Sequence, residues 1–313
     1  RVEARIREVF EAPRARAYMV ATGTAANALA LACLCPPWAT VYAHAGSHVE
    51  NDECAAPEFY TGGSKLTLIG GADARIDADE LAERIRTAAP HDIHNVQNGA
   101  VSITQATELG AIYPLDEVRR LTGIAHDAGM GVHMDGTRFA NAVARLGCSP
   151  AEASWKAGVD ILCLGATKNG AMAAETVVIF DPAKAREFEL RRKRAGHLFS
   201  KMRFVAAQMD AYLTDRLWLE MAGHANAMAG RLASGIAGAP GCRVLNTVEA
   251  NMIFAEIPLA THRRLQEAGA RYYAAHGGQD ETGPGDAPYT VRLVASFETA
   301  EAEVERFVEV LQG

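Results

Sequence analysis

The stretch ILCLGATKNGAM, residues 161–172, begins with four apolar residues and passes through two small ones before it reaches Thr-Lys, where the lysine is Lys168. This run predicts a strand whose carboxyl end delivers one amine into a pocket. Upstream, HMDGTRFAN at residues 133–141 has a similar form, because an apolar strand ends at Asp135 and Arg138 follows. Parallel strands end at the same edge of a sheet, so we expect these three side chains to meet there.

The three side chains are the parts that a pyridoxal phosphate enzyme needs. The amine of Lys168 can form a Schiff base, and the carboxylate of Asp135 can hold a protonated ring nitrogen. Partial burial would lower the pKa of the amine and keep it nucleophilic. The plainer alternatives are an exposed lysine and an aspartate that caps a helical turn. We favour the cofactor interpretation because Arg138 follows Asp135 and Lys168 lies at a fitting distance along the chain.

Short apolar runs alternate with helical patterns over the first two thirds of the chain. This alternation is typical of an α/β fold, with a mostly parallel central sheet and helices on both faces. We expect strands at residues 16–21, 40–44, 66–69, 94–103, 131–135, 159–164 and 176–180. We expect helices at residues 24–35, 79–89, 115–128 and 141–146, after an amphipathic helix that opens the chain.

The pattern changes beyond Pro182. Residues 183–235 form an almost unbroken helical pattern, and beyond Pro240 short strands mix with helices. These strands are expected at residues 242–245, 250–256 and 289–295, and the helices at residues 259–275 and 299–311. We therefore predict a large cofactor-binding domain at residues 1–182, a connecting helical region at residues 183–238 and a small α+β domain at residues 239–313. A Gly/Pro-rich loop at residues 276–288 lies inside the small domain.

Composition excludes several classes of protein. The chain has 313 residues, of which 49% are hydrophobic and 22% charged, as in globular proteins. A net charge of −7 and a pI near 5.8 argue against nucleic acid or a membrane as a partner. The longest apolar stretch, Ala28–Cys35, is too short to cross a bilayer, and we see no secretory leader. No methionine precedes Arg1, so we expect that an N-terminal segment is missing.

The six cysteines are irregularly spaced and form no Cys-x-x-Cys pair. Several of them fall inside apolar patterns and are expected to be small buried residues. This usage favours a reducing cytoplasm, and we expect no metal ion at the site.

The segment TGTAAN joins the first strand to its helix and is a candidate for phosphate binding. Gly23 would let the backbone approach an anion, and the amides of Gly23 and Thr24 stand at a helix start. A simple helix cap is an equally common use of such a segment. Because the neighbouring strands end in Asp135 and Lys168, phosphate binding is the interpretation that we favour.

His48 and Arg292 are the remaining candidates. His48 follows a short strand and would stack on the cofactor ring and reach a substrate hydroxyl, although loop histidines are more often solvated and His44 competes with it. Arg292 lies on an apolar strand, where a charge needs a partner. That partner is either a substrate carboxylate, held by two hydrogen bonds, or an acid within the small domain.

Taken together, several segments resemble the L-threonine aldolases, a group of fold-type I pyridoxal phosphate enzymes. The similarity covers nearly the whole chain. It includes ATGTAANALALA, AHAGSHVENDE, QATELGAIYPLDEV, HMDGTRFANAVARLG, GATKNGAMAAETVVIF, HLFSKMRFVAAQ and YTVRLVASF. HMDGTRFAN with a Thr-Lys-Asn-Gly segment downstream is fairly specific. SITQATELGAIYP resembles the low-specificity and phenylserine-cleaving branch.

The resemblance implies a fold-type I transferase-like fold with pyridoxal 5'-phosphate as cofactor. It also implies retro-aldol cleavage of a small amino-acid substrate (threonine, allo-threonine or phenylserine) to glycine and an aldehyde. Carried over by position, the resemblance implies that Lys168 binds the cofactor covalently and that Asp135 pairs with its ring nitrogen. Gly23 and Thr24 would bind the phosphate, and His48 would stack on the ring. Arg138 would contact the ring oxygen or the substrate carboxylate, and Arg292 would hold that carboxylate. Lys201 and Arg203 fall in a segment that would approach the phosphate of the same subunit or of a neighbouring one. The resemblance also implies a dimer or tetramer with its sites at subunit interfaces.

One departure from the family concerns Glu108, which stands where some relatives have a second active-site histidine. His48, directly or through a water, is then the expected base. The rival hypotheses are β-elimination, transamination or serine hydroxymethyl transfer on the same scaffold, and a silent homologue that binds the cofactor without reaction. The intact set of Asp135, Arg138 and Lys168 argues against a silent homologue. A Rossmann-type nucleotide binder is disfavoured, because no Gly-x-Gly-x-x-Gly follows the first strand.

Overall fold

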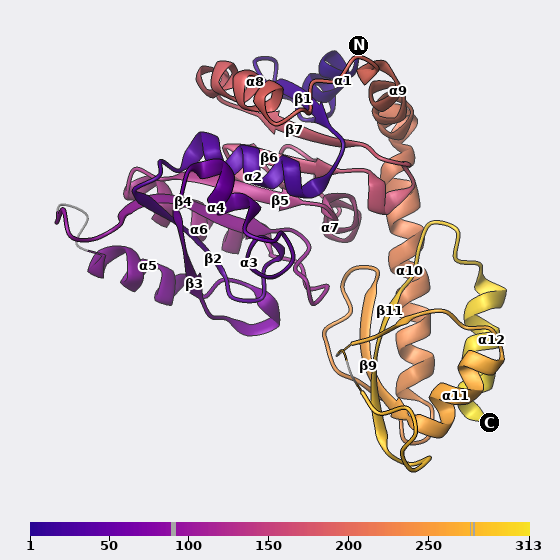
Figure 1. Cartoon of the computed structure of the whole chain (residues 1–313). Coiled ribbons are helices and arrows are strands. Elements are labelled where there is room, and N and C mark those ends of the chain that lie inside the picture. Colours follow the sequence, from indigo (N-terminus) through magenta and orange to yellow (C-terminus); the bar gives the residue numbers. More distant parts are fainter. Residues whose placement is uncertain (89–91, 276, 278) are drawn as a thin grey trace.

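The computed structural model describes residues 1–88, 92–275, 277 and 279–313. Two sheets organise the chain: a seven-stranded sheet precedes a four-stranded sheet in the sequence (Figure 1). A long helix, α10 (Leu217–Ala237), runs from the region of the first sheet to the second. The predicted α/β class, with a smaller α+β part at the carboxyl end, is confirmed. None of the described helices has the length and apolarity needed to cross a membrane.

The large sheet has the order β1-β7-β6-β5-β4-β2-β3. Its strands are β1 (Arg16–Val20), β2 (Ala39–His44), β3 (Lys65–Ile69), β4 (Gln97–Thr104), β5 (Gly131–Gly136), β6 (Ile161–Gly165) and β7 (Glu175–Ile179). Strands β6, β5, β4, β2 and β3 are parallel neighbours, whereas β7 is antiparallel to both β6 and β1. Strand β1 therefore runs in the same direction as β6, and every strand except β7 ends at one edge of the sheet.

The strand β7 departs from the βα alternation that the sequence pattern indicated. It follows β6 after residues 166–174 only, a connection too short for the crossover that a parallel pair requires. The chain therefore turns back beside β6. The turn itself contains Lys168, so the reversal at this point exposes the lysine at the edge of the sheet.

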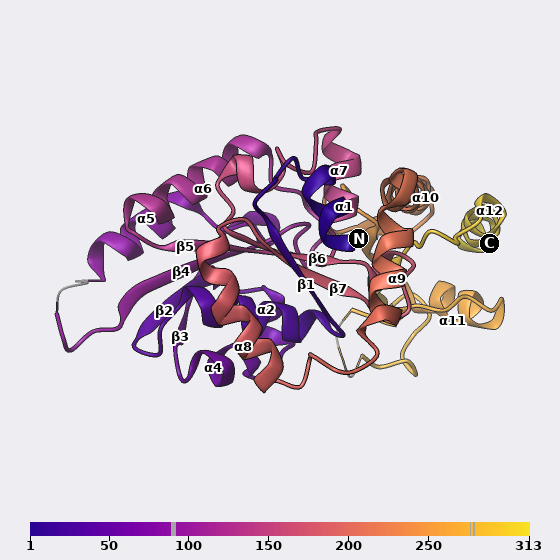
Figure 2. The ribbon, with the colours of Figure 1, turned by 90° about the horizontal axis from the view of Figure 1, so that it is seen from above.

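Helices cover both faces of the large sheet (Figure 2). On one face lie α1 (Val2–Val9), α5 (Ala78–Thr87), α6 (Leu115–Asp127) and α7 (Phe139–Leu146). On the other lie α2 (Gly23–Leu34) and α8 (Ala185–Arg194), with α4 (Ala56–Thr61) packed on α2. Helix α2 is buried from Ala25 to Leu34, which explains why its sequence is apolar on all sides.

The helical region after Pro182 is more broken than its pattern predicts. It is divided into the helices α8, α9 (Met202–Leu213) and α10, which agree with the helical pattern of residues 183–235 but interrupt it twice. Helix α8 stops because Gly196 adopts a φ of 79° and the amide of His197 bonds back to the carbonyl of Arg192 at 3.0 Å. Between α9 and α10, Asp215 and Arg216 adopt a positive φ and break the helical path again.

The small sheet has the order β10-β11-β9-β8 and is antiparallel throughout. Its strands are β8 (Arg243–Val244), β9 (Met252–Pro258), β10 (Tyr273–Ala274) and β11 (Pro288–Val294), and it packs with α10, α11 (Leu259–Glu267) and α12 (Glu301–Gln312). Helix α11 ends earlier than expected, because Gly269 has a φ of 95° and the chain then enters β10. The predicted helix end at Ala89 lies outside the described residues.

Candidate functional site

Neighbouring strands of the large sheet carry the candidate residues at their carboxyl ends. Strand β6 leads to Lys168, and β5 leads to Asp135 and Arg138. Strand β4 leads to Glu108, and β2 leads to His48 at the start of α3 (His48–Asn51). Since these strands are adjacent and parallel, the residues that the sequence pattern singled out lie along one edge of the sheet.

A single 3-10 turn, Thr167–Asn169, holds Lys168 directly after β6. Asn169 anchors this turn: its Nδ2 donates to the hydroxyl of Tyr212 at 2.9 Å and to the carbonyl of Trp218 at 2.9 Å. Both partners are buried in the core between α9 and α10. The backbone on the carboxyl side of Lys168 is therefore fixed, whereas its own side chain is exposed at the edge of the sheet in the isolated chain.

Partial burial of the amine lowers the pKa of Lys168 below its ordinary value, and the positive charge of Arg138 adds to this effect. The negative charges of Glu108 and Asp135 oppose it. A lower pKa increases the share of neutral amine at neutral pH. The neutral amine is the nucleophilic form, so the surroundings of Lys168 suit covalent chemistry.

Asp135 is 2% exposed and still ionised, because hydrogen bonds outweigh its burial. Burial alone would raise the pKa of Asp135, but the Thr137 hydroxyl at 2.7 Å and the Thr137 amide at 3.0 Å both donate to Oδ1 and lower it. The nearby rings of His133 and His48 also lower it. Asn27 donates to Oδ2 at 2.9 Å. A buried carboxylate that stays charged is suited to hold a cationic nitrogen.

His48 pairs with a buried acid. Its Nδ1 lies 2.8 Å from Oε1 of Glu53, and the same oxygen accepts a hydrogen bond of 2.8 Å from Nδ2 of Asn27. The hydrogen bond with Glu53 raises the pKa of His48, against a smaller opposing effect of burial. One side-chain atom each of His48, Glu53 and Asp135 lie within 4.8 Å of one another, so the three groups form one compact cluster.

Helix α2 begins at the same edge. The side chain of Thr22 caps it by accepting a hydrogen bond of 3.2 Å from the amide of Ala25. The amides of Gly23 and Thr24 stand in the first helical turn, where no carbonyl of the same helix can accept from them. Two such donors at a helix start form a cradle for an anion.

The segment before α9 approaches the turn that precedes α2. Nδ1 of His197 accepts a hydrogen bond of 3.3 Å from the amide of Ala21, so this histidine lies beside the proposed phosphate cradle. Lys201 and Arg203 are exposed in the isolated chain, and the guanidinium of Arg203 lies 5.2 Å from the ring centre of Phe204. The structure of one chain thus brings His197 to the cradle but leaves Lys201 and Arg203 facing outward.

Two arginines, one at each sheet, are the remaining basic candidates for the site. Arg138 is 6% exposed and its Nε is buried without a hydrogen-bond partner among the described residues. Burial of the guanidinium lowers the pKa of Arg138, and the negative charge of Glu108 raises it. The positive charge of Arg292 on β11 also lowers the pKa of Arg138, so the charges of the two arginines act on each other. Nη2 of Arg292 lies 3.2 Å from the sulfur of Met252, and no described carboxylate pairs with this arginine. A salt bridge within the small domain, the alternative raised by the sequence, is thus not formed.

These residues fit pyridoxal phosphate. The unpartnered Nε of Arg138 and the first amides of α2 are donors that an anionic ligand would satisfy. The ionised Asp135 would hold the ring nitrogen, and Lys168 would supply the amine for attachment. All of them lie at the edge where ligands bind in such folds.

Comparison with known proteins assigns the chain to a family. Residues 1–258 match the family described as beta-eliminating lyases. The chain is 43% identical over 274 residues to the low specificity L-threonine aldolase of Pseudomonas aeruginosa, which covers 87% of this chain and 78% of that protein. The chain belongs to this family, among its L-threonine aldolases.

Further relatives agree with this membership. A second low specificity L-threonine aldolase, from a Pseudomonas species, is 39% identical over 298 residues, with 95% of this chain and 82% of that protein covered. The solved structure of a Leishmania major threonine aldolase has a TM-score of 0.90 at 26% identity, and covers 99% of this chain and 87% of that one. A Sphingomonas wittichii serine palmitoyltransferase, with a TM-score of 0.73 at 15% identity, shares the fold alone. The family resemblance inferred from the sequence is confirmed.

Four residues at or beside the site were not singled out by the sequence analysis: Asn27, Glu53, Thr137 and His197. Asn27 carries a recognisable signal, because it is a lone amide in the apolar helix ANALALA and is 1% exposed. Glu53 carries none, since it is one of three acids in HVENDE and only the fold decides which of them turns inward. Thr137 lies inside the quoted motif HMDGTRFAN but was assigned no role.

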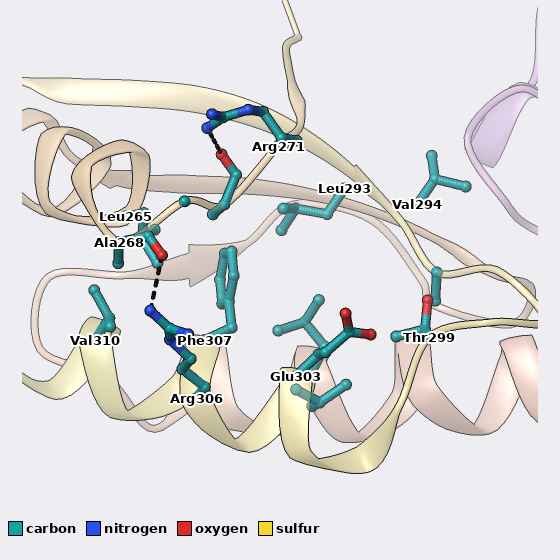
Figure 3. A pocket seen from close by; sticks show the side chains of 15 residues that line it. Leu265, Ala268, Arg271, Leu293, Val294, Thr299, Glu303, Arg306, Phe307 and Val310 are labelled. Carbon is teal, nitrogen blue, oxygen red and sulfur yellow. Dashed lines mark hydrogen bonds between the residues drawn. The ribbon is translucent and has the colours of Figure 1, made fainter.

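A separate cavity of about 430 Å³ lies in the small domain, between α11, β11 and α12 (Figure 3). Its lining is largely apolar, with Phe307 and several leucines, and includes charged residues. Of these, Arg306 donates to the carbonyl of Ala268 at 3.1 Å, at the end of the neighbouring helix α11, and Glu303 accepts from the amide of Ala300 at 2.8 Å, at the start of its own helix α12. None of the candidate catalytic residues lines this cavity.

Proposed function

We propose that the chain cleaves a β-hydroxy-α-amino acid of the threonine type to glycine and an aldehyde, with pyridoxal 5'-phosphate as cofactor. The observation that carries this proposal is the ionised, buried Asp135 beside Lys168 at the ends of adjacent parallel strands. The identity to proteins named low specificity L-threonine aldolase supports the substrate class. When bound, the cofactor supplies an electron-accepting ring for the electron pair of the broken Cα–Cβ bond.

Three groups of the chain hold the cofactor in this proposal. Asp135 keeps a proton on the ring nitrogen, because its hydrogen bonds with Thr137 and Asn27 keep the carboxylate charged. The amides of Gly23 and Thr24 bind the phosphate at the start of α2. Lys168 attaches covalently, and its lowered pKa favours that step.

The substrate carboxylate binds to Arg138 and Arg292. The buried Nε of Arg138 lacks a partner among the described residues, and Arg292 has no acid of its own among them. A planar guanidinium donates two parallel hydrogen bonds to a carboxylate, which fixes orientation as well as affinity. Held from two sides, the substrate can present its Cα–Cβ bond in one orientation only.

His48 removes the proton from the β-hydroxyl group in this scheme. Its Nδ1 is engaged with Glu53, which leaves Nε2 as the atom that can accept the proton. With the cofactor and substrate bound, the side chain of Lys168 would lie near the substrate Cα and could deliver a proton there. His48 gains one proton and Lys168 gives one, so transfer of one proton from His48 to Lys168, directly or through solvent, restores both groups before the next turnover.

Replacement of Lys168 by alanine tests the function. We expect the variant to lose the covalent attachment that borohydride reduction reveals, and to release glycine more slowly by about a thousandfold or more. Lys65→Ala, an exposed lysine on β3, serves as the control and should retain both. Full glycine release by the Lys168→Ala protein, or a reduced cofactor adduct on another lysine, would overturn the proposal.

β-Elimination is the second candidate, because the matching family is described by that reaction. Both reactions begin with the same binding of the amino group and carboxylate, and they differ in which bond at Cβ breaks. Threonine, allo-threonine and phenylserine should yield glycine and an aldehyde under our proposal. Release of ammonia and a 2-oxo acid from the same substrates would favour elimination.

The proposed partner, besides the small-molecule substrate, is a second copy of the chain. Support comes from exposed apolar side chains around the start of α9: Met172 is 89% exposed and Phe204 60%, with Leu198 and Phe199 nearby in the sequence. The amide of Met172 donates to Gln208 on α9 at 2.9 Å, so Met172 lies beside this helix. A homo-oligomer, dimer or tetramer, would cover these side chains and bring Arg203 and Lys201 to a neighbouring phosphate. Light scattering of the purified protein tests this, and a monomer would exclude it.

We also propose that the protein acts in the cytoplasm. All six cysteines are free in the structure, and Cys33, Cys35 and Cys163 are buried, where a reducing compartment leaves thiols unchanged. Fractionation of cells that express the protein tests this location.

A further inference from the structure

Glu53 is buried completely, with a side chain that is 0% exposed. Its Oε1 accepts from Nδ2 of Asn27 and faces Nδ1 of His48, both at 2.8 Å, whereas its buried Oε2 has no hydrogen-bond partner among the described residues. A buried carboxylate destabilises a fold unless its partners compensate for lost hydration. This incompletely paired acid beside the candidate base therefore points to a role in the site.

We propose that Glu53 is a positioning residue: it holds His48 in the tautomer with the proton on Nδ1, so that Nε2 offers its lone pair to the substrate hydroxyl. The inference rests on the proposed function, in which His48 is the base. An ionised carboxylate can only accept, so the ring nitrogen that faces it must donate. The His48 side chain is 26% exposed, and no described residue hydrogen-bonds its Nε2.

Asn27 extends the arrangement to the cofactor side. Its Nδ2 donates to Glu53 at 2.8 Å and to Asp135 at 2.9 Å, so both amide protons are used on carboxylates. The amide of Asn27 lies between the carboxylates of Glu53 and Asp135, which would otherwise repel each other. Its two N–H groups offset this repulsion, as a bound cation would in such a cluster. Because Asn27 needs an acceptor on each side, it favours the ionised form of Glu53 as well as of Asp135.

The charges around His48 act in the same direction. The hydrogen bond with Glu53 raises the pKa of His48 most, and the negative charges of Glu53, Asp135 and Glu108 add to it, while burial opposes. Burial raises the pKa of Glu53, and its hydrogen bonds with His48 and Asn27 oppose that rise. The imidazolium of His48 thus loses its proton at a higher pH than that of an ordinary histidine. In the neutral ring that results, the remaining proton is on Nδ1.

The backbone after Glu53 is shaped for this contact. Cys54 and Ala55 both adopt left-handed conformations, with φ values of 51° and 57°. Such conformations are unfavourable for residues with a Cβ, so the surrounding structure must hold them in place. The turn they form separates α3 from α4 and directs the Glu53 side chain inward while Cys54 faces outward.

Nuclear magnetic resonance of the full-length protein with ¹⁵N-labelled histidine tests the proposal, as purified and after addition of pyridoxal phosphate. The His48 signals are assigned with a His48→Gln variant, and the chemical shifts report which ring nitrogen carries the proton. The variants to compare are Glu53→Gln, Glu53→Asp and the control Glu50→Gln, which changes an exposed acid of the same helix as His48.

We expect His48 of the unsubstituted protein to carry its proton on Nδ1 and to titrate above 6.5, the ordinary pKa of histidine. In Glu53→Gln the pKa should fall to that value or below and the Nε2-protonated form should appear. Glu53→Asp and Glu50→Gln should keep the raised pKa. An Nε2-protonated His48 in the unsubstituted protein overturns the proposal even where a variant fails to fold. An unchanged titration and tautomer in a folded Glu53→Gln variant overturns it too.

Kinetics separate this inference from the proposed function. Glu53→Gln should lower kcat about 10- to 100-fold, with little change in KM, and should move the acid limb of the pH profile to lower pH. Glu53→Asp should recover part of kcat. Absence of glycine release by the unsubstituted protein defeats the proposed function and leaves the tautomer result intact. Normal kcat in Glu53→Gln defeats only the positioning role.

Discussion

Glu175 carries a carboxyl group at the start of β7, in the middle of the edge that the candidate residues share. It is 6% exposed and lies opposite Val20 on β1 and Gly165 on β6. Burial raises the pKa of Glu175 to about 7, although hydrogen bonds from Thr167 oppose the rise. The folded chain therefore keeps a proton here that the unfolded chain has lost at the same pH.

This difference makes the stability of the protein depend on pH in a definite direction. An unfolded glutamate loses its proton near 4.5, whereas the folded Glu175 keeps it up to about pH 7. The unfolded state then binds fewer protons between these values, so this contribution to stability is present below pH 4.5 and is lost as pH rises through 7.

Substitution of Glu175 by glutamine removes the titration and keeps the shape of the side chain. Relative to the unsubstituted protein, we expect the variant to gain stability as pH rises from about 4.5 to 8, by about 3 kcal/mol at most. Urea unfolding of both proteins at several pH values measures the gain. Glu305→Gln, an exposed acid on α12, is the control and should show none. A pH-independent difference for Glu175→Gln would show that the group is ionised in the fold.

At the residue scale, local pattern identified part of the site. Lys168 and Asp135 follow apolar strands directly, so their place at the sheet edge follows from strand direction alone. Glu53 could not be found this way, because its inward direction depends on the left-handed turn at Cys54 and Ala55. Neither residue of that turn is a glycine, so nothing in the sequence marks it.

At the scale of elements, β5 and β6 approach so closely at the site that they require glycine. A Cβ built on Gly165 would lie 2.7 Å from Cα and 2.8 Å from the carbonyl oxygen of Thr137, and 3.0 Å from Oε2 of Glu175. Two of these atoms belong to the backbone and cannot rotate away. The strand that carries Lys168 is thus held against the segment that carries Asp135.

Substitution of Gly165 by alanine should force these strands apart. We expect a loss of stability of about 1 to 3 kcal/mol, the usual effect of overpacking, together with weaker cofactor binding because Lys168 moves relative to Asp135. Thermal melting and fluorescence titration with pyridoxal phosphate measure the two effects. Gly123→Ala on the exposed face of α6 meets nothing within 4 Å and should stabilise the helix by about 0.5 to 1 kcal/mol. Unchanged melting and cofactor affinity in Gly165→Ala would contradict the close approach.

The order of elements was largely predictable, and their ends and breaks were less so. Apolar periodicity indicated the strands of the large sheet within one to three residues at most ends. The break after α8 depends on Gly196 in a helical pattern, where a glycine is often tolerated without a break. The short strand β10 exists only because β11 pairs with it, and that contact is not local in the sequence.

At the scale of the whole molecule, the proposed site draws on both sheets. Arg292 belongs to β11 of the small sheet, whereas Lys168, Asp135 and His48 lie on or after strands of the large one. Polar contacts join the two parts: the Glu249 carboxylate accepts from the amide of Ile112 at 2.7 Å, and Asn226 on α10 donates to the carbonyl of Asn141 at 3.0 Å. The predicted boundaries after residues 182 and 238 stay a prediction, which these two separate sheets support.

Because Arg292 binds only the substrate in our scheme, its loss should affect the amino acid and spare the cofactor. We expect Arg292→Gln to raise KM about 10- to 100-fold, the effect of a lost charge-assisted pair, with unchanged affinity for pyridoxal phosphate. Steady-state kinetics and cofactor titration measure both. Arg243→Gln on β8, an exposed arginine paired with Glu256, is the matched control. Weakened cofactor binding in Arg292→Gln would contradict our scheme and show that Arg292 contacts the cofactor.

The helix α10 begins in the core of the large part, where Trp218 is 1% exposed, and ends in the core of the small part with Leu232 and Ile236. Helix α10 therefore joins the large sheet to the small sheet, and the small sheet carries Arg292 on β11. In our proposal, a slight tilt of α10 would change how Arg292 contacts a larger or smaller amino acid, while the contacts of the cofactor with the large sheet stay the same. Substrate range in this protein can thus be changed far from the reacting atoms, through packing along a single helix.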